Sequence, residues 1–510
     1  MLPFLRVTNN KSKKYVVSFR GINYGEGYQE GEFSETQNVS TAQFPCVSQR
    51  SGRASEGNFS SPTALHAKDY LLVIDGTKAI YNNEVVYDKL SSGRKQIATV
   101  GNYIIIFPDK VFYNVDTKVF GSMEETYTAS GLKFENDSIT TTGNSFPFRV
   151  GDAITISGCS AKPENNRTLE EAIIIRGVEG EKLTFYENSF TDGTESGTVT
   201  LKREVPDLDF ICESNYRLWG TKGNTIYSSK FMDPLNFNVF DGLVSDSYAI
   251  SVGSDGEFTG CAPFSSHICF FKENTLHKLY GIKPSNFQIV TSQVYGVQAG
   301  SERSIRTINE TLFYKGVGGV YAYAGGVPEL VSGSFGTRRY TNACAESDGS
   351  RYYISMQDEG GWHVFVYDVQ RNLWVREDDT HCVDMAFHDG YVYFLTADGR
   401  LLRVDGNEDK SDVEWSVTLC PFTETVNERK GYSKYHLRLD MSEGSWITVE
   451  QKRDIDTEWH EIYTAHSDRA RTMSIPVLPA RCDSVEIRIS GKGACLLRTF
   501  VREFFTGSDV

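Results

Sequence analysis

The chain has 510 residues, a formal net charge of −15, and an aromatic content of 13% that includes 31 Phe and 27 Tyr. So acidic a chain excludes a protein that wraps nucleic acid by counterion release, which requires a basic face. Hydrophobic residues make up 39% of the chain and glycines number 45, which excludes disordered and collagen-like chains and favours a turn-rich globular protein.

Residues 1–60 are polar and rich in glycine, with Gly21, Gly25 and Gly27 close together. Few apolar residues alternate there, so we expect an extended N-terminal arm that lies on other surfaces and straps a neighbouring copy. Its deletion should then spare the rest of the fold. The apolar residues at the very start lack the charged beginning and long core of a signal peptide.

A short unit follows and returns about seven times: an apolar strand, a polar turn with Gly or Asn, and a second strand that usually ends in tyrosine. The copies begin at Tyr70, Tyr103, Tyr216, Ile268, Leu312, Tyr352 and Tyr391. Most are spaced by roughly 40 residues, which is typical of a β-propeller, because one blade cannot bury both faces of its sheet alone. We predict six to eight blades from residues 61–125 and 204–411.

One interval breaks this rhythm, since 113 residues separate Tyr103 from Tyr216. The spacing falls to about 35 if residues 126–203 are an insertion. Alternating residues at 153–157 and 183–186, with Gly-Asp and Glu-Gly turns nearby, predict a small independent β-barrel or sandwich. A loop between two blades can accept such an insertion at little entropic cost.

Residues 412–510 form the last region. Apolar and polar residues alternate in several stretches of it, at Leu437 and Leu439, Ile447 and Val449, and Val485, Ile487 and Ile489. About seven strands in ~100 residues fit an antiparallel β-sandwich with one face of each sheet in the core. Its tryptophans, Trp415, Trp446 and Trp459, are expected to fill the interior rather than to bind a ligand.

The whole chain is therefore predicted to be all-β, a propeller with an inserted small β domain and a C-terminal β-sandwich. No apolar run is long enough for a membrane span. The ten cysteines are scattered and none forms a CxxC pair, which indicates free thiols in a protein made in a cytosol and disfavours a zinc site.

Candidate catalytic and metal-binding patterns are weak. His460 and His466 are two residues too far apart for the HExxH zinc motif, and residues 405–409 lack the terminal Glu of a calcium loop. Gly316–Gly319 has no following Lys-Ser/Thr, so a tight hairpin turn is expected. We predict no catalytic, cofactor-binding or metal-binding residues.

Acidic pairs are relevant because several propellers are glycosidases. Asp378-Asp379 and Glu124-Glu125 are each adjacent in sequence, which places the two carboxylates on opposite faces of a strand, a poor geometry for a paired acid and base. Ser347-Asp348-Gly349 lacks the Trp of a sialidase box. The chain is therefore not predicted to be an enzyme.

Basic clusters are few. They lie at Arg338-Arg339, at Lys452-Arg453, and at Lys11, Lys13 and Lys14. Contact with phosphate is one interpretation of each cluster. Ordinary surface charge or an ion pair between subunits is the other, and it is favoured in so acidic a chain.

Six stretches of the sequence share one resemblance: residues 215–237, 44–53, 151–157, 312–321, 481–485 and 501–504. Together they resemble a family of bacteriophage tail proteins, known as tail stabilisation, tail accessory or tail nozzle (tubular protein B-like) proteins. These motifs mark blades and turns and specify no reaction. The insertion and the C-terminal sandwich differ in size from the family pattern, which leaves the position within the tail open.

The resemblance implies a virion protein, made in the host bacterial cytoplasm, that sits below the portal and adaptor of the tail. It implies a ring, usually hexameric, around the channel through which DNA leaves. Six copies would carry a formal charge of −90, six times −15, and such a channel would let DNA pass without specific binding. The alternative is a carbohydrate-binding or carbohydrate-active propeller associated with host recognition.

Overall fold

A computed structural model describes residues 10–186, 188–407, 413–467, 471–478 and 480–506. These residues form β-strands joined by turns, together with four short 3-10 helices, η1 (Pro163–Asn165), η2 (Pro284–Asn286), η3 (Glu302–Ser304) and η4 (Gly333–Phe335). The predicted all-β class is confirmed. The chain divides into two compact units. We call residues 61–305 and 315–317 the barrel unit, and residues 1–60, 306–314 and 318–510 the sandwich unit.

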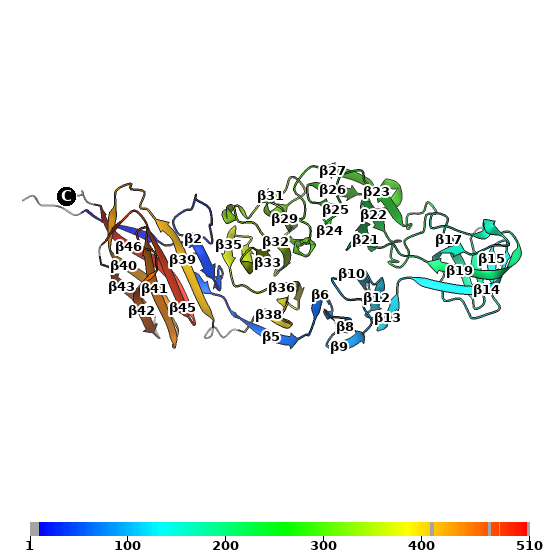
Figure 1. The fold of residues 1–510 in the computed structure, drawn as a ribbon, viewed down its shortest axis with the longest axis horizontal. Helices are drawn as coiled ribbons and strands as arrows, with labels where there is room; N and C mark the ends of the chain where they lie inside the picture. The colour runs from blue at the N-terminus through cyan, green and yellow to red at the C-terminus, as the bar shows by residue number, and fades with distance from the viewer. Residues whose placement is uncertain (1–9, 187, 408–412, 468–470, 479, 507–510) are drawn as a thin grey trace, which may run out of the picture. The chain divides into compact units, whose positions relative to one another are not determined.

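Seven four-stranded antiparallel sheets in the described residues are the blades of the predicted propeller (Figure 1). The barrel unit holds four of them: β6 (Pro62–Lys68), β7 (Tyr70–Asp75), β8 (Lys78–Tyr81), β9 (Glu84–Tyr87); β10 (Gln96–Val100), β11 (Tyr103–Phe107), β12 (Val111–Asn114), β13 (Val119–Ser122); β20 (Phe210–Ser214), β21 (Arg217–Lys222), β22 (Thr225–Ser228), β23 (Tyr248–Ser251); and β24 (Gly260–Phe264), β25 (His267–Lys272), β26 (Thr275–Tyr280), β27 (Gln288–Ser292).

The sandwich unit holds the other three, apart from residues 315–317. Their strands are β28 (Arg306–Ile308), β29 (Thr311–Gly316), β30 (Gly319–Tyr323), β31 (Glu329–Leu330); β32 (Thr341–Ser347), β33 (Arg351–Asp358), β34 (Gly361–Asp368), β35 (Leu373–Arg376); and β36 (Cys382–His388), β37 (Tyr391–Thr396), β38 (Arg400–Asn407) with β5 (Gly52–Asn58). In both units the first strand of one sheet contacts the first strand of the next.

Strand β11 shows why these sheets must stack. Ile104, Ile105, Ile106 and Phe107 are all at most 1% exposed. Ile104 and Ile106 pack with the β6–β9 sheet, whereas Ile105 and Phe107 pack with the β20–β23 sheet. Because successive side chains point to opposite faces of a strand, one continuous apolar run covers two neighbouring sheets. Each fully buried side chain contributes about 2 kcal/mol of transfer free energy.

The predicted insertion is a closed six-stranded barrel on the barrel unit (Figure 1). Its strands are β14 (Glu125–Glu135), β15 (Ser138–Thr140), β16 (Ala153–Ser157), β17 (Ile173–Glu179), β18 (Lys182–Phe185) and β19 (Gly193–Arg203). The barrel has its own core. It is also fastened to the rest of its unit, since Arg203 Nε donates a 3.1 Å bond to the Met123 carbonyl and Asn236 Nδ2 donates a 3.1 Å bond to Asp152 Oδ1.

The predicted C-terminal β-sandwich is confirmed, but the N-terminal segment helps to build it. A seven-stranded sheet contains β1 (Asn10–Val16), β3 (Val39–Ser40), β4 (Val47–Gln49), β40 (Lys430–Met441), β43 (Arg471–Pro476), β44 (Arg481–Cys482) and β46 (Cys495–Thr506). A five-stranded sheet contains β2 (Phe33–Gln37), β39 (Glu414–Phe422), β41 (Ser445–Arg453), β42 (His460–Ser467) and β45 (Val485–Lys492).

The expected extended arm is therefore wrong for residues 10–58. β1 and β4 pair with β46, β2 pairs with β39, and β5 completes the last blade beside β38. The physical reason is that polar strands need no core of their own when an existing sheet edge supplies their backbone hydrogen bonds. The N-terminal segment thus ties the sandwich to the last blade of its own chain.

The interior of the sandwich holds only one of the three tryptophans expected there. Trp415 is 4% exposed and belongs to the core. Trp446 and Trp459 are partly exposed. In β41 the buried positions are Ser445, Ile447, Val449 and Gln451, so the strand's period of two turns Trp446 to the outer face.

Candidate functional site: a polar cavity beside the closing strand

A cavity of about 760 Å³ opens in the sandwich unit where β5 meets the last blade. Its wall includes the start of β5, the turn between β35 and β36, the β37–β38 hairpin and the start of β39. The polar side chains in that wall include Arg50, Arg53, Asp378, Thr380, Asp398 and Arg400. Several of them carry charges that lie close together.

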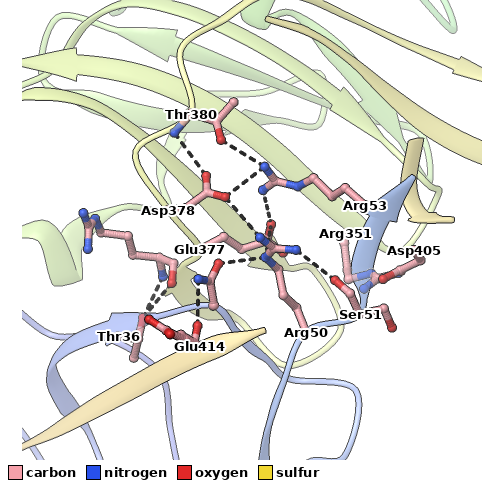
Figure 2. A network of polar contacts seen from close by, with 12 residues as sticks. Thr36, Arg50, Ser51, Arg53, Arg351, Glu377, Asp378, Thr380, Asp405 and Glu414 are labelled. Atoms are coloured by element: carbon pink, nitrogen blue, oxygen red, sulfur yellow. Dashed lines mark hydrogen bonds and ion pairs between the residues drawn. The ribbon is translucent and has the colours of Figure 1, made fainter. Parts of the chain in front are cut away.

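Two arginines from the N-terminal segment converge on two carboxylates from the β35–β36 turn (Figure 2). Arg53 Nη2 lies 2.7 Å from Glu377 Oε2, and Arg53 Nη1 lies 2.9 Å from Asp378 Oδ2. Arg50 Nη2 donates a 3.2 Å bond to Asp378 Oδ2. Each guanidinium thus contacts a carboxylate, and the four formal charges cancel.

The surroundings of Arg53 complete the network. Its Nη1 also donates a 3.0 Å bond to Thr380 Oγ1, and its guanidinium lies 4.7 Å from the centre of the Phe394 ring. Burial opposes a charged guanidinium, but Asp378 and Glu377 together raise the pKa of Arg53 above its usual range. Removing either carboxylate would leave a buried cation without full compensation.

Asp378 stays ionised despite its burial. Burial works to raise the pKa of Asp378, but Arg53 and Arg50 hold it below its ordinary value. Asp398 sits at the rim and is paired with Arg400 at 2.9 Å, and the pKa of Asp398 is lowered by Thr396 and Arg400. A general acid needs a raised pKa and a general base needs an unengaged carboxylate, so Asp378 and Asp398 are suited to holding the surrounding strands in place.

The acidic pairs named from the sequence do not act together. Asp378 faces the arginines of the N-terminal segment, whereas Asp379 Oδ1 lies 2.9 Å from His363 Nδ1. Glu124 Oε1 accepts a 2.9 Å bond from Lys110, and Glu125 follows as the first residue of β14. Side chains of residues adjacent in sequence thus point to different partners, as expected for extended backbone.

The other motifs also have structural partners. Gly316 and Gly319 flank the β29–β30 turn, as predicted. Asp348 forms a 2.7 Å ion pair with Arg351 in the β32–β33 turn. Asp405 lies 3.0 Å from Arg351, and residues 408 and 409 of the same motif lie outside the described residues.

The histidine motif is part of a strand. His460 and His466 both lie in β42, and His460 Nε2 lies 3.6 Å from Asp456 Oδ1. In the ranges that the structure describes, no group of three or more His, Cys, Asp or Glu side chains is placed to hold a metal ion. All ten cysteines are free thiols, and all except Cys46 are buried.

The basic clusters mostly serve internal contacts. Lys13 lies 2.6 Å from Glu503, and Lys14 lies 3.2 Å from Glu424. The Arg338 guanidinium lies 3.5 Å from the centre of the Tyr24 ring. The Arg50–Glu377 network could not be predicted from the sequence, because its members are more than 300 residues apart in the chain and lie in motifs that separately resemble ordinary turns.

A second cavity, of about 1190 Å³, lies in the barrel unit beside the β25–β26 turn. Lys272 is 2% exposed there, and its Nζ donates 2.7 Å bonds to Asn224 Oδ1 and to the Ser254 carbonyl. Burial lowers the pKa of Lys272. Four carboxylates line the same cavity, those of Asp209, Asp255, Glu257 and Glu273. Their negative charge disfavours an anionic ligand.

Comparisons with known proteins concern the fold alone. No family model and no curated protein matches the chain. Among solved structures, the chain is similar to the computationally designed Ika8 protein, with 13% identity, a TM-score of 0.38 and coverage of 70% of this chain and 99% of that one. It is similar to BamB from Moraxella catarrhalis, with 9% identity, a TM-score of 0.32 and coverage of 77% and 97%.

A third similar structure is Hsv2 from Kluyvelomyces marxianus, with 10% identity, a TM-score of 0.27 and coverage of 50% of this chain and 73% of that one. In the part of the chain that the structure describes, none of the helices has the length and apolar character needed to cross a membrane. The sheet topology of the described residues, with seven four-stranded blades, a closed barrel and a two-sheet sandwich, defines the all-β fold.

Proposed function

We propose that this chain is a structural subunit of a bacteriophage tail, placed below the portal and adaptor and forming part of the conduit for DNA ejection. The proposal begins from the resemblance of residues 215–237 and the other blade and turn motifs to tail nozzle proteins. One feature of the molecule supports it. The charged groups of the polar cavity beside β5 are paired with one another and hold the chain together, with no catalytic arrangement among them.

A subunit under mechanical load needs elements that cannot peel apart. The N-terminal segment contributes strands to both sheets of the sandwich and to the last blade, so any force on one of these sheets is shared with the others. We propose that six such subunits form a ring through head-to-tail interfaces. The net charge of −15 per subunit would make the ring repel DNA phosphates and so let the genome slide.

The test is the composition and shape of phage particles. Mass spectrometry of purified particles should detect this chain at a constant ratio to the portal protein. The number of copies per particle should be close to the six of the proposed ring. Particles from a phage in which the gene carries an early stop codon should have filled or leaking heads without the distal tail. Absence of the chain from infectious wild-type particles would reject the tail assignment.

A further inference from the structure

The outer face of the five-stranded sandwich sheet carries two tryptophans that the core does not use. Trp446 lies in β41 and Trp459 lies in the turn before β42, and both are partly exposed. Trp415, in the same sheet, is 4% exposed. Neighbouring groups cover most of both side chains, but each keeps part of its ring at the surface, where a ligand can contact it.

A charged pair links the two aromatic positions. Arg488 of β45 donates 2.6 Å and 2.8 Å bonds from Nε and Nη2 to the two carboxylate oxygens of Glu450. The Arg488 guanidinium lies 4.5 Å from the centre of the Trp459 ring. Glu450 is four residues along β41 from Trp446, so the two tryptophans mark out a strip of about 13 Å at ~3.3 Å per residue.

The surface between them is lined by hydroxyl groups. Thr448 Oγ1 and Thr464 Oγ1 lie 3.1 Å apart, and Thr464 Oγ1 donates a 2.9 Å bond to Glu461 Oε1. Ser490 pairs with Thr448 across the strands. The strip therefore alternates aromatic rings with groups that both donate and accept hydrogen bonds.

On β41, β42 and β45 the charges around this strip balance, and the exposed Glu414 of the neighbouring strand β39 lies opposite Lys492. Three acidic and three basic side chains lie on β41, β42 and β45 at these positions: Glu450, Glu461, Glu486, Lys452, Arg488 and Lys492. A balanced face gives no net attraction to a polyanion such as DNA. It also lacks the continuous apolar centre that a stable protein–protein interface has.

The turn that carries Trp459 is held before any ligand arrives. Arg453 Nε and Nη2 donate 2.8 Å and 2.9 Å bonds to the two oxygens of Asp456. Hydrogen bonding to Arg453 lowers the pKa of Asp456 to about 2, so the pair is intact at neutral pH. A fixed turn reduces the ordering cost of binding.

We propose that this face binds a neutral glycan chain, with sugar rings stacked on Trp446 and Trp459. The C–H faces of a pyranose ring carry partial positive charge and match the negative face of an indole ring. The sugar hydroxyls would bond to Thr448, to Glu450 and to Arg488. This site is separate from the conduit role and does not depend on it.

Affinity electrophoresis of the full chain tests the proposal. The probes are gels that contain one soluble neutral polysaccharide each: a linear β-glucan, a mannan, a galactan or a xylan. At least one should retard the wild-type protein, and Trp446→Ala and Trp459→Ala should each weaken that retardation about tenfold. The matched control is Trp362→Ala, a partly exposed tryptophan of β34, which should migrate like the wild type. Circular dichroism verifies that each variant is folded.

Three results would overturn the proposal. One is a wild-type protein that none of the four glycans retards. Another is retardation that persists in both Trp446→Ala and Trp459→Ala. The last is a change of oligomeric state in these variants, measured by light scattering, which would make the face a contact between copies. Retardation should also be nearly independent of salt between ~0.05 and ~0.5 M, because the face is charge-balanced.

Discussion

Buried charges in this protein are stabilised by partners drawn from distant parts of the chain. Arg502 is 2% exposed and pairs with Glu424 and with Glu30. Arg53 forms ion pairs with Glu377 and Asp378. A buried pair contributes little net stability by itself, but breaking it by removing one partner is costly. The N-terminal segment therefore has one favoured position, because any other would leave these buried charges without their partners.

Substitution of one cavity carboxylate measures that cost. Asp378→Asn removes a charge that compensates both Arg50 and Arg53, so we expect the free energy of unfolding to fall by about 3 kcal/mol. Differential scanning calorimetry gives the change. The matched control is Asp379→Asn, whose side chain is 64% exposed and whose loss should cost less than about 1 kcal/mol. Equal effects of the two substitutions would show that the network does not hold β5.

Two buried histidines make the barrel unit sensitive to mild acid. His267 and His277 are 6% and 1% exposed, and burial lowers the pKa of each to about 4. In the unfolded chain each would titrate near its usual 6.5. The unfolded state therefore binds more protons than the folded state between about pH 6.5 and 4, and stability falls as the pH drops through that window.

We expect each histidine to cost on the order of 2 kcal/mol of unfolding free energy between about pH 7 and pH 4. Urea unfolding at a series of pH values measures this loss. Replacing His277 by Gln keeps hydrogen-bonding groups for Ser254 and Thr291, its partners at 2.8 Å and 2.9 Å, and should halve the pH dependence. If the unfolding free energy of the wild type did not change with pH, both histidines would bind protons as readily in the folded chain as in the unfolded chain.

At the scale of the element, the closing strand decides whether the fold is complete. Deleting residues 1–60 removes β1 to β5, leaves the last blade with three strands, and leaves Glu377 and Asp378 without Arg50 and Arg53. In contrast to the expectation of a dispensable arm, we expect insoluble protein or loss of cooperative unfolding. A soluble variant with a sharp melting transition would contradict the pairing of β5 with β38.

The inserted barrel should behave in the opposite way. Glu125 and Arg203 are paired neighbours, so a short Gly/Ser linker can replace residues 126–203 without moving the blades. The excision uncovers Val239, which packs against the barrel, and leaves Asn236 with its other partner, Asp233. We expect a folded protein whose melting temperature is lower by a few degrees, as measured by calorimetry. Aggregation would show that the barrel is needed for its unit to fold.

The predictable elements are those whose apolar pattern is strong. The blades could be predicted from apolar runs such as Ile104–Phe107, and the sandwich from the alternation at Val485, Ile487 and Ile489. In both, burial determines which face of the strand each side chain occupies. Strands β1 and β5 carry few apolar residues, and only the sheet edges that they complete make them strands. The outward position of Trp446 was within reach of the sequence, since its neighbour Ile447 occupies the inward parity.

The cavity network was out of reach for a different reason. Arg50 and Arg53 meet Glu377 and Asp378 only through the tertiary fold. Their spacing along the chain has no period that would indicate a contact. Co-variation between positions cannot be seen in a single sequence. Only the tertiary structure reveals that these charged side chains form ion pairs with one another.

For the whole molecule, net charge governs the proposed passage of DNA. A formal charge of −15 per chain repels phosphates at long range, and the Lys13, Lys14 and Arg338 side chains contact groups of their own chain. We therefore expect negligible affinity for duplex DNA at physiological salt and no sequence preference. A gel-shift titration of the purified protein against duplexes of different sequence measures both, and a parallel titration at low salt sets the upper limit of any electrostatic attraction. Tight binding whose strength falls steeply with salt would place a basic DNA-gripping surface on the protein and would contradict a conduit that lets its cargo slide.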